Sequence, residues 1–273
     1  MIKKPFFTHQ GATYHLVQKG SPQRQPLLLL HGFTGSAISW QSHFAAFAPH
    51  FWVIAPDILG HGRSDSPPDP SRYRMPCIAA DLIALLDFWQ IEQTALLGYS
   101  MGGRLAFYLA CHFPDRFSRI ILESCSPGLA AKAERAARRQ SDETLADWIE
   151  ANGIEPFVAR WEALPLWQSQ QQLAPEVRQQ LRQNRLQNSP LGLANSLRGM
   201  GTGAQPSLWP QLAAVQQPTL LIVGELDTKF VAINQQMVAQ LANGRLQVIP
   251  RAGHTTHLEQ PEQFATAVIQ FLL

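Results

Sequence analysis

Three residues occur in this chain in the order and the local settings that activate a hydroxyl group. Ser100 is the centre of the motif GYSMGG, Asp227 ends the segment GELD, and His254 ends the segment RAGH. Glycines two residues before and after a serine let a strand and a helix approach closely at a sharp turn. A serine hydroxyl is a poor nucleophile or base until a histidine takes its proton and an acid orients that histidine. We therefore interpret Ser100, Asp227 and His254 as a candidate catalytic triad.

Other residues compete for two of these roles. Glu225 or Glu123 could be the acid, and Asp227 could instead cap the helix that follows it. His257, one turn further on, is the alternative histidine. His254 is favoured because it follows the last predicted strand, where a triad histidine belongs.

Backbone N–H donors for a developing negative charge are expected on both sides of the serine. Met101 follows it directly, and a second donor is expected from the loop HGFTG, where Phe33 is the best candidate. The alternative is that this loop only shapes a turn. His31 and His61 lie in glycine-containing loops and are expected to be structural.

The segments that must position these residues alternate between apolar runs and helical patterns. Strands are predicted at residues 13–18, 26–30, 51–55, 94–97, 118–123, 218–224 and 245–249. Helices are predicted from the loop at 31–36 to about 48, at 78–89, from 105, at about 232–241 and from 261. Such alternation predicts a parallel sheet with helices on its faces. All three triad residues would then emerge at the carboxyl edge of the sheet, where open α/β sheets bind ligands.

Residues 127–206 interrupt this alternation. The stretch is rich in Ala, Gln, Arg and Trp, and its spacing is helical with no convincing strand. We therefore predict a core formed by residues 1–126 and 207–273, with a helical insertion at 127–206.

Composition limits the classes of protein to consider. The chain has 273 residues, of which 45% are hydrophobic and 15% charged, as in a globular protein, and a net charge of +2. That charge gives no electrostatic case for nucleic acid or an anionic membrane as a partner. The start of the sequence lacks the apolar segment of a secretory signal, and three cysteines without metal-ligand spacing favour reduced thiols in the cytoplasm. We predict no metal and no cofactor.

Taken together, the motifs HGFTG, DILGHGRS, GYSMGG, GELD and AGH resemble those of the α/β-hydrolase superfamily. The chain order Ser, Asp, His is also that of this superfamily. The resemblance implies a mostly parallel central sheet flanked by helices, with the insertion acting as a helical lid over the active site. It leaves the chemistry open, because this fold hosts many reactions.

Arginines give the first indication of the substrate. Arg104 lies one helical turn after Ser100 on the same face, and the insertion carries two sets of arginines with helical spacing, at 135, 138 and 139 and at 178, 182 and 185. Solvated helix faces, helped by Glu134 and Glu176, are one interpretation. The other is a pocket for a small polycarboxylate, because guanidinium groups bind carboxylates in a bidentate manner.

A narrower resemblance favours the second interpretation. The segments GYSMGGR, SPGL, AERAARRQSD, GELDTKF and IPRAGH are similar to those of the 2-succinyl-6-hydroxy-2,4-cyclohexadiene-1-carboxylate synthases of menaquinone and phylloquinone biosynthesis. The resemblance implies a lyase that eliminates pyruvate from a tricarboxylate, with the triad as general base and an oxyanion hole for the enolate. It implies substrate-binding roles for Tyr99, Arg104, Arg138, Trp161 and Arg185.

Two other functions stay open at this point. One is a serine hydrolase of esters or carbon–carbon bonds in acidic substrates, with Ser100 as a covalent nucleophile. The other is a small-molecule receptor, which a degraded triad would indicate; nothing in this triad is degraded. We expect a cytoplasmic monomer or small homo-oligomer.

Overall fold

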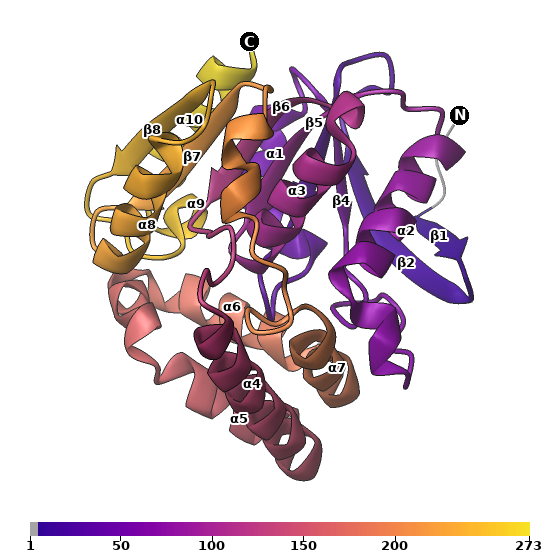
Figure 1. The fold of residues 1–273 in the computed structure, drawn as a ribbon, viewed down its shortest axis with the longest axis vertical. Helices are drawn as coiled ribbons and strands as arrows, with labels where there is room; N and C mark the ends of the chain where they lie inside the picture. The colour runs from indigo at the N-terminus through magenta and orange to yellow at the C-terminus, as the bar shows by residue number, and fades with distance from the viewer. Residues whose placement is uncertain (1–4) are drawn as a thin grey trace.

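The computed structural model describes residues 5–273 and arranges them around an eight-stranded sheet. The strand order is β1 (Phe6–His9), β2 (Ala12–Lys19), β4 (Trp52–Pro56), β3 (Pro26–Leu30), β5 (Thr94–Tyr99), β6 (Phe117–Glu123), β7 (Thr219–Gly224) and β8 (Gly244–Ile249). β2 is antiparallel to both of its neighbours, and every other pair is parallel. The predicted fold, a mostly parallel sheet flanked by helices, is confirmed (Figure 1).

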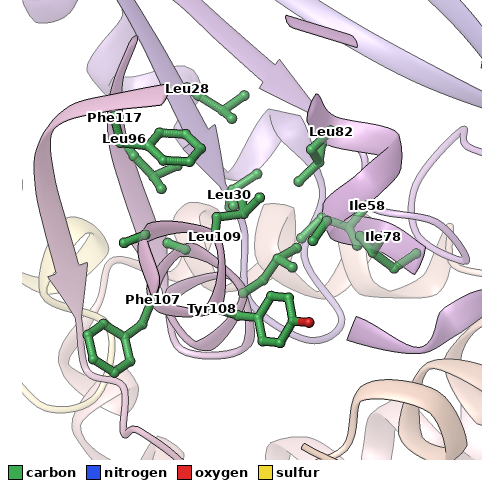
Figure 2. Packing of buried hydrophobic residues seen from close by; sticks show 14 of the residues in the cluster. Leu28, Leu30, Ile58, Ile78, Leu82, Leu96, Phe107, Tyr108, Leu109 and Phe117 are labelled. Atoms are coloured by element: carbon green, nitrogen blue, oxygen red, sulfur yellow. The ribbon is translucent and has the colours of Figure 1, made fainter. Parts of the chain in front are cut away.

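Helices cover both faces of the sheet. One face is covered by α2 (Met75–Phe88), α3 (Met101–His112) and α8 (Thr228–Val238), and the other by α1 (Gln41–Phe47) and α10 (Pro261–Leu272). Side chains alternate between these two layers along the buried strands; Leu28 and Leu30 pack toward α3, whereas Leu27 and Leu29 face the opposite layer. Figure 2 shows the first of these layers. This burial on both faces explains the continuous apolar runs of the central strands.

Some elements differ from the sequence-based expectation. The four-residue strand β1 was not predicted; it is too short to show a period of its own and is defined by its pairing with β2. The helix expected up to residue 48 is divided into a 3₁₀ turn, Ala37–Trp40, and α1. α8 begins at Thr228 rather than near 232, directly after Asp227.

Between β6 and β7 the chain forms a helical layer, which we call the lid. It consists of α4 (Lys132–Asn152), α5 (Ile154–Glu162), a 3₁₀ segment η4 (Pro165–Gln172), α6 (Pro175–Leu186) and α7 (Pro190–Met200). In Figure 1 these helices lie together below the sheet, beyond the layers that cover its two faces. Helices α4, α5 and α7 share an apolar cluster of their own, which includes Ile149, Phe157 and Leu197. The boundaries 127 and 206 stay a prediction.

Within residues 5–273, none of the helices combines the length and the apolar character that crossing a membrane requires.

Candidate active site

Ser100 occupies a strained turn between β5 and α3. Its φ of 50° lies in the left-handed region that non-glycine residues rarely adopt. The neighbouring backbones are very close here: a Cβ added to Gly102 would lie 2.2 Å from the carbonyl oxygen of Leu30. Only glycine permits this approach of α3 to the end of β3. The sharp turn leaves the Ser100 side chain partly exposed at the carboxyl edge of the sheet.

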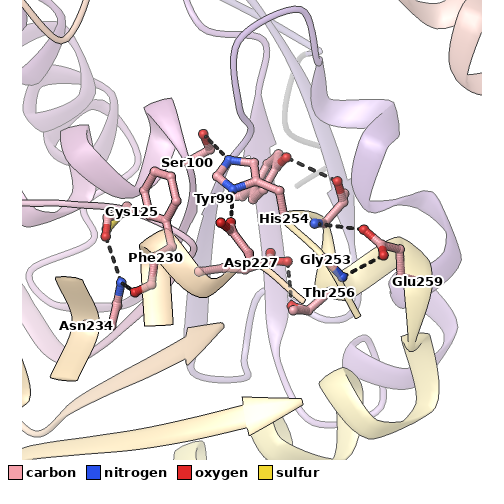
Figure 3. Close-up of polar contacts among 12 residues, drawn as sticks. Tyr99, Ser100, Cys125, Asp227, Phe230, Asn234, Gly253, His254, Thr256 and Glu259 are labelled. Atoms are coloured by element: carbon pink, nitrogen blue, oxygen red, sulfur yellow. Dashed lines mark hydrogen bonds and ion pairs between the residues drawn. The ribbon is translucent and has the colours of Figure 1, made fainter. Parts of the chain in front are cut away.

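The structure brings Ser100, His254 and Asp227 together (Figure 3). His254 Nε2 lies 3.0 Å from Ser100 Oγ, and His254 Nδ1 lies 2.6 Å from Asp227 Oδ2. With Nδ1–H donating to Asp227, Nε2 is free to accept the serine proton. Asp227 and His254 are both buried, so their attraction is weakly screened by water. The arrangement can withdraw a proton and stabilise the imidazolium that forms.

The alternative acids make other contacts. Asp227 stands at the N-cap position of α8, but its side chain makes no capping hydrogen bond. Glu123 binds His257 Nδ1 at 2.8 Å in a separate, fully buried pair. That pairing and the hydrogen bonds to Glu123 hold the pKa of its carboxyl below the usual range, against the effect of burial. Glu225 accepts the backbone N–H of Arg251.

Both glycine-loop histidines make local backbone contacts. His31 Nε2 accepts the N–H of Ile58 at 2.9 Å, and His61 Nδ1 lies 3.2 Å from the carbonyl of Leu59. Burial lowers the pKa of both rings, to about 3 for His61. The His31 contact with Ile58 and the packing of the two rings, with centroids 5.2 Å apart, connect the loop after β3 with the loop after β4, as a structural role requires.

The predicted oxyanion donors flank Ser100. Met101 is the first residue of α3, and the first N–H groups of a helix have no acceptor within it. The close contact between Gly102 and the end of β3 places the start of the Phe33 loop beside this turn. The Phe33 ring packs against Trp161, with centroids 5.4 Å apart. Their use as an oxyanion hole stays a prediction.

A cavity of about 500 Å³ is lined by the residues next to two triad members in the chain, Tyr99 before Ser100 and Thr255 after His254. Its core side includes Phe33, Tyr99 and Thr255, and its lid side includes Trp167 and Arg185. Ser100 and His254 do not line it, although Tyr99 precedes Ser100 and the Tyr99 ring lies 5.6 Å from that of His254. The volume is in the range of small-molecule sites.

Arg185 is the predicted arginine that reaches this cavity. It is only 5% exposed, and its Nη1 donates to Glu162 at 3.0 Å while Nη2 donates to Gln170 at 3.3 Å. Its guanidinium also lies 5.5 Å from the centre of the Trp167 ring. Burial lowers the pKa of Arg185, and its buried Nε has no acceptor among residues 5–273.

Arg104 and Arg138 lie in another part of the boundary between core and lid. Arg104 Nη1 donates to the carbonyl of Met200 and to Gln205, both at 2.8 Å. Burial, together with the charge of Arg138, lowers the pKa of Arg104 to about 10. Arg138 binds Asp142 at 2.7 Å. Asp142 pairs with Arg138, whereas Arg104 binds uncharged acceptors, and neither guanidinium lines the cavity.

The two predicted aromatic contacts differ in position. Tyr99 lines the cavity, its hydroxyl lies 3.3 Å from Thr255 Oγ1, and burial raises its pKa. Trp161 packs between Phe33 and Trp167 without lining the cavity. Its buried indole N–H has no acceptor among residues 5–273.

Two lid residues at the site were not predicted. Trp167 packs nearly perpendicular to His254, with centroids 5.6 Å apart. Gln170 donates from Nε2 to Thr255 Oγ1 at 2.8 Å and accepts from Arg185. The tryptophan content of the insertion was a signal for Trp167, whereas Gln170 is one glutamine among many in this stretch.

Within residues 5–273, no group of His, Cys, Asp and Glu side chains has an arrangement that could hold a metal ion.

Comparisons with family models, curated proteins and solved structures all identify relatives with the same fold. A model of the alpha/beta hydrolase fold family matches residues 25–261. A putative 2-succinyl-6-hydroxy-2,4-cyclohexadiene-1-carboxylate synthase of Bacillus subtilis (strain 168) is 45% identical over 96% of this chain and 95% of its own length. The enzyme of that name from Serratia proteamaculans is 32% identical over 94% of this chain and 97% of its own. The structure of MenH from S. aureus superposes with a TM-score of 0.90 at 39% identity, covering 95% of this chain and 97% of that one.

Proposed function

The chain belongs to the α/β-hydrolase fold family, and we propose that it is a 2-succinyl-6-hydroxy-2,4-cyclohexadiene-1-carboxylate synthase, the activity in the names of its B. subtilis and S. proteamaculans relatives. The reaction eliminates pyruvate from 2-succinyl-5-enolpyruvyl-6-hydroxy-3-cyclohexene-1-carboxylate. The protein is thus a carbon–oxygen lyase of menaquinone or phylloquinone biosynthesis. A tricarboxylate substrate, a cytoplasmic location and a monomer or small homo-oligomer are parts of the same proposal.

The triad performs the proton transfer in this proposal. His254, oriented by Asp227, takes the proton of Ser100, and the serine oxygen takes a proton from the ring carbon of the substrate. This proton comes from C2, next to the succinyl carbonyl, and its electron pair first forms the enolate of that carbonyl. The pair then forms the C2–C3 double bond as the C3–C4 double bond shifts to C4–C5 and the C5–O bond breaks. The leaving enolpyruvate takes the proton held by His254 and becomes pyruvate. The N–H groups of Met101 and Phe33 stabilise the enolate that develops on the substrate. No hydrolytic water is consumed.

One observation carries the assignment: a connected Ser100–His254–Asp227 set lies near a cavity that is lined by the buried Arg185 guanidinium. A lid for neutral esters has little need for such a group. Arg185 in the cavity, with Arg104 and Arg138 at the second part of the boundary, suits a substrate with several carboxylates. Tyr99 lines the cavity, and the proposed role of Trp161 is exerted through Phe33 and Trp167, which line the cavity and contact it.

The test is a direct comparison of two reactions. Purified protein is incubated with the enolpyruvyl substrate, and pyruvate release is followed with a coupled dehydrogenase; cleavage of an aryl ester is measured in parallel. We expect rapid pyruvate release and slow ester cleavage. The matched control is Ser100→Ala, which should lower the rate of pyruvate release by about 10²–10⁴-fold. Rapid ester cleavage without pyruvate release would favour the hydrolase alternative.

A further inference from the structure

The loop that carries His254 is held by a carboxylate outside the triad. Glu259 lies at the end of the short helix α9 (Thr256–Glu259), and its side chain reaches back along the loop. Its Oε2 accepts the N–H of Gly253 at 2.7 Å, and its Oε1 accepts the N–H of Thr255 at 3.1 Å. Figure 3 shows the two hydrogen bonds on either side of His254.

We propose that Glu259 is a positioning residue for His254. One carboxylate binds the N–H groups of the residues immediately before and after His254, Gly253 and Thr255, and so restrains the backbone from which its side chain leaves. The inference rests on the proposed function, in which His254 relays the proton.

The geometry required of the His254 ring explains why its backbone must be held in place. Its ring is held at two opposite corners, at 2.6 Å to Asp227 and 3.0 Å to Ser100, so a rotation that shortens one contact lengthens the other. Residues 251–255 lie in neither a helix nor a strand, and the backbone hydrogen bonds to this loop go to the carbonyls of Ala252 and Thr255, whereas Glu259 binds N–H groups. Misplacing a catalytic group by about 1 Å can lower a rate by about 10²-fold.

The hydrogen bonds of Glu259 also hold a contact between this loop and the lid. Thr255, whose N–H binds Glu259, accepts a hydrogen bond from Gln170 of η4 at its side-chain oxygen. Gly253, the other residue that Glu259 binds, passes so close to η4 that an added Cβ would lie 2.1 Å from Ser169 Oγ. A shift of this loop would therefore disturb the lid contact together with His254.

The chain provides a matched control. Glu225 also accepts a backbone N–H of this loop, that of Arg251 at 3.0 Å, but three residues before His254 and on the exposed side. Glu259→Gln keeps the shape of the side chain and one acceptor oxygen while its amide group faces the second N–H; Glu259→Ala removes both acceptors. A positioning role predicts a graded loss, larger for alanine than for glutamine.

The experiment measures the reactivity of Ser100, the kinetics of pyruvate release and the hydrogen bond between His254 and Asp227. The first readout is the second-order rate at which phenylmethylsulfonyl fluoride modifies Ser100. The second is kcat and KM for pyruvate release, and the third is the low-field proton resonance of the His254–Asp227 hydrogen bond. For Glu259→Gln we expect Ser100 modification and kcat to fall by about 10-fold or more, with KM unchanged and the low-field resonance broadened. Glu225→Gln should keep the wild-type values.

Two results would overturn the inference. One is a folded Glu259→Gln protein, with wild-type circular dichroism, that keeps the wild-type modification rate and proton resonance. The other is an equal slowing by Glu225→Gln, which would indicate general stabilisation of the loop. If Glu259→Gln slows Ser100 modification but the wild-type protein releases no pyruvate, the proposed function fails and the positioning role stands.

Discussion

The rings of Trp167 and His254 meet edge to face at an interplanar angle of 68°, with centroids 5.6 Å apart, although Trp167 belongs to the lid and His254 to the core. The indole also lies under the Arg185 guanidinium. One lid side chain thus contacts both the proposed proton acceptor and the buried cation that lines the cavity. The lid therefore contributes side chains to the candidate site.

Replacing Trp167 by leucine should impair the reaction while the fold is retained. Leucine keeps an apolar contact but loses the aromatic edge against His254 and the ring face beneath Arg185. The two interactions together are worth about 1–2 kcal/mol, so we expect kcat/KM for pyruvate release to fall by about 10-fold. The control is Trp148→Leu, whose indole contacts Arg160 and does not line the cavity. Equal losses in both variants would contradict a specific role for Trp167.

Arg104→Lys tests the second proposed anion site. Lysine keeps the positive charge but not the planar fork that binds a carboxylate in a bidentate manner. Truncation to alanine would be less clear, because it leaves the acceptors of Met200 and Gln205 without their donor. We expect kcat/KM to fall by about 10–100-fold, as for one charge-assisted hydrogen bond to a charged group. Arg178→Lys, at an exposed lid position, should have wild-type kinetics; unchanged kinetics for Arg104→Lys would remove Arg104 from the site.

Gly253→Ala tests the contact between η4 and the loop of His254. The added Cβ would lie 2.1 Å from Oγ and 2.8 Å from Cβ of Ser169. Relieving such overlap typically costs about 1–3 kcal/mol, which should appear as a lower thermal midpoint and slower pyruvate release. Because both clashing atoms belong to one side chain, adding Ser169→Gly should restore most of the loss. A double variant no better than Gly253→Ala would show that another contact causes the defect.

Buried histidines should make the protein less stable at mildly acidic pH. Burial and the neighbouring His257 lower the pKa of His43 to about 4, despite the nearby charge of Glu123. In the unfolded chain a histidine has a pKa of about 6.5. Between these two pKa values the unfolded state binds more protons than the folded state. The contribution of His43 to the free energy of unfolding is therefore complete above pH 6.5 and is lost as the pH falls toward 4.

His43→Gln provides the measurement for this pH dependence. Glutamine can keep the donor to the His257 carbonyl, which His43 Nε2 reaches at 2.8 Å, but it does not titrate. From pH 7 to pH 5 the wild-type protein should lose about 2 kcal/mol more unfolding free energy in urea than the variant. The window lies above the range in which Glu123, with its lowered pKa, would take up a proton. Identical pH profiles would contradict the assignment to His43.

The sequence determined the fold, the chain order of the candidate triad and the strand ends from which its members emerge. These features are local: an apolar run, a glycine-flanked turn and a short polar segment after each strand are contained within a few residues. Parallel strands then bring their carboxyl ends to one edge of the sheet, so Ser100, Asp227 and His254 converge without any detail of side-chain packing.

Only the tertiary structure decided which polar groups face one another across the boundary between core and lid. Helical spacing put Arg178, Arg182 and Arg185 on one face, but packing buries Arg185 and leaves Arg178 exposed. Gln170 and Glu259 had no distinguishing local pattern, since their contacts depend on how η4 and the His254 loop meet. A periodic pattern specifies the face that a helix presents, whereas the partner on that face is set by segments distant in the chain.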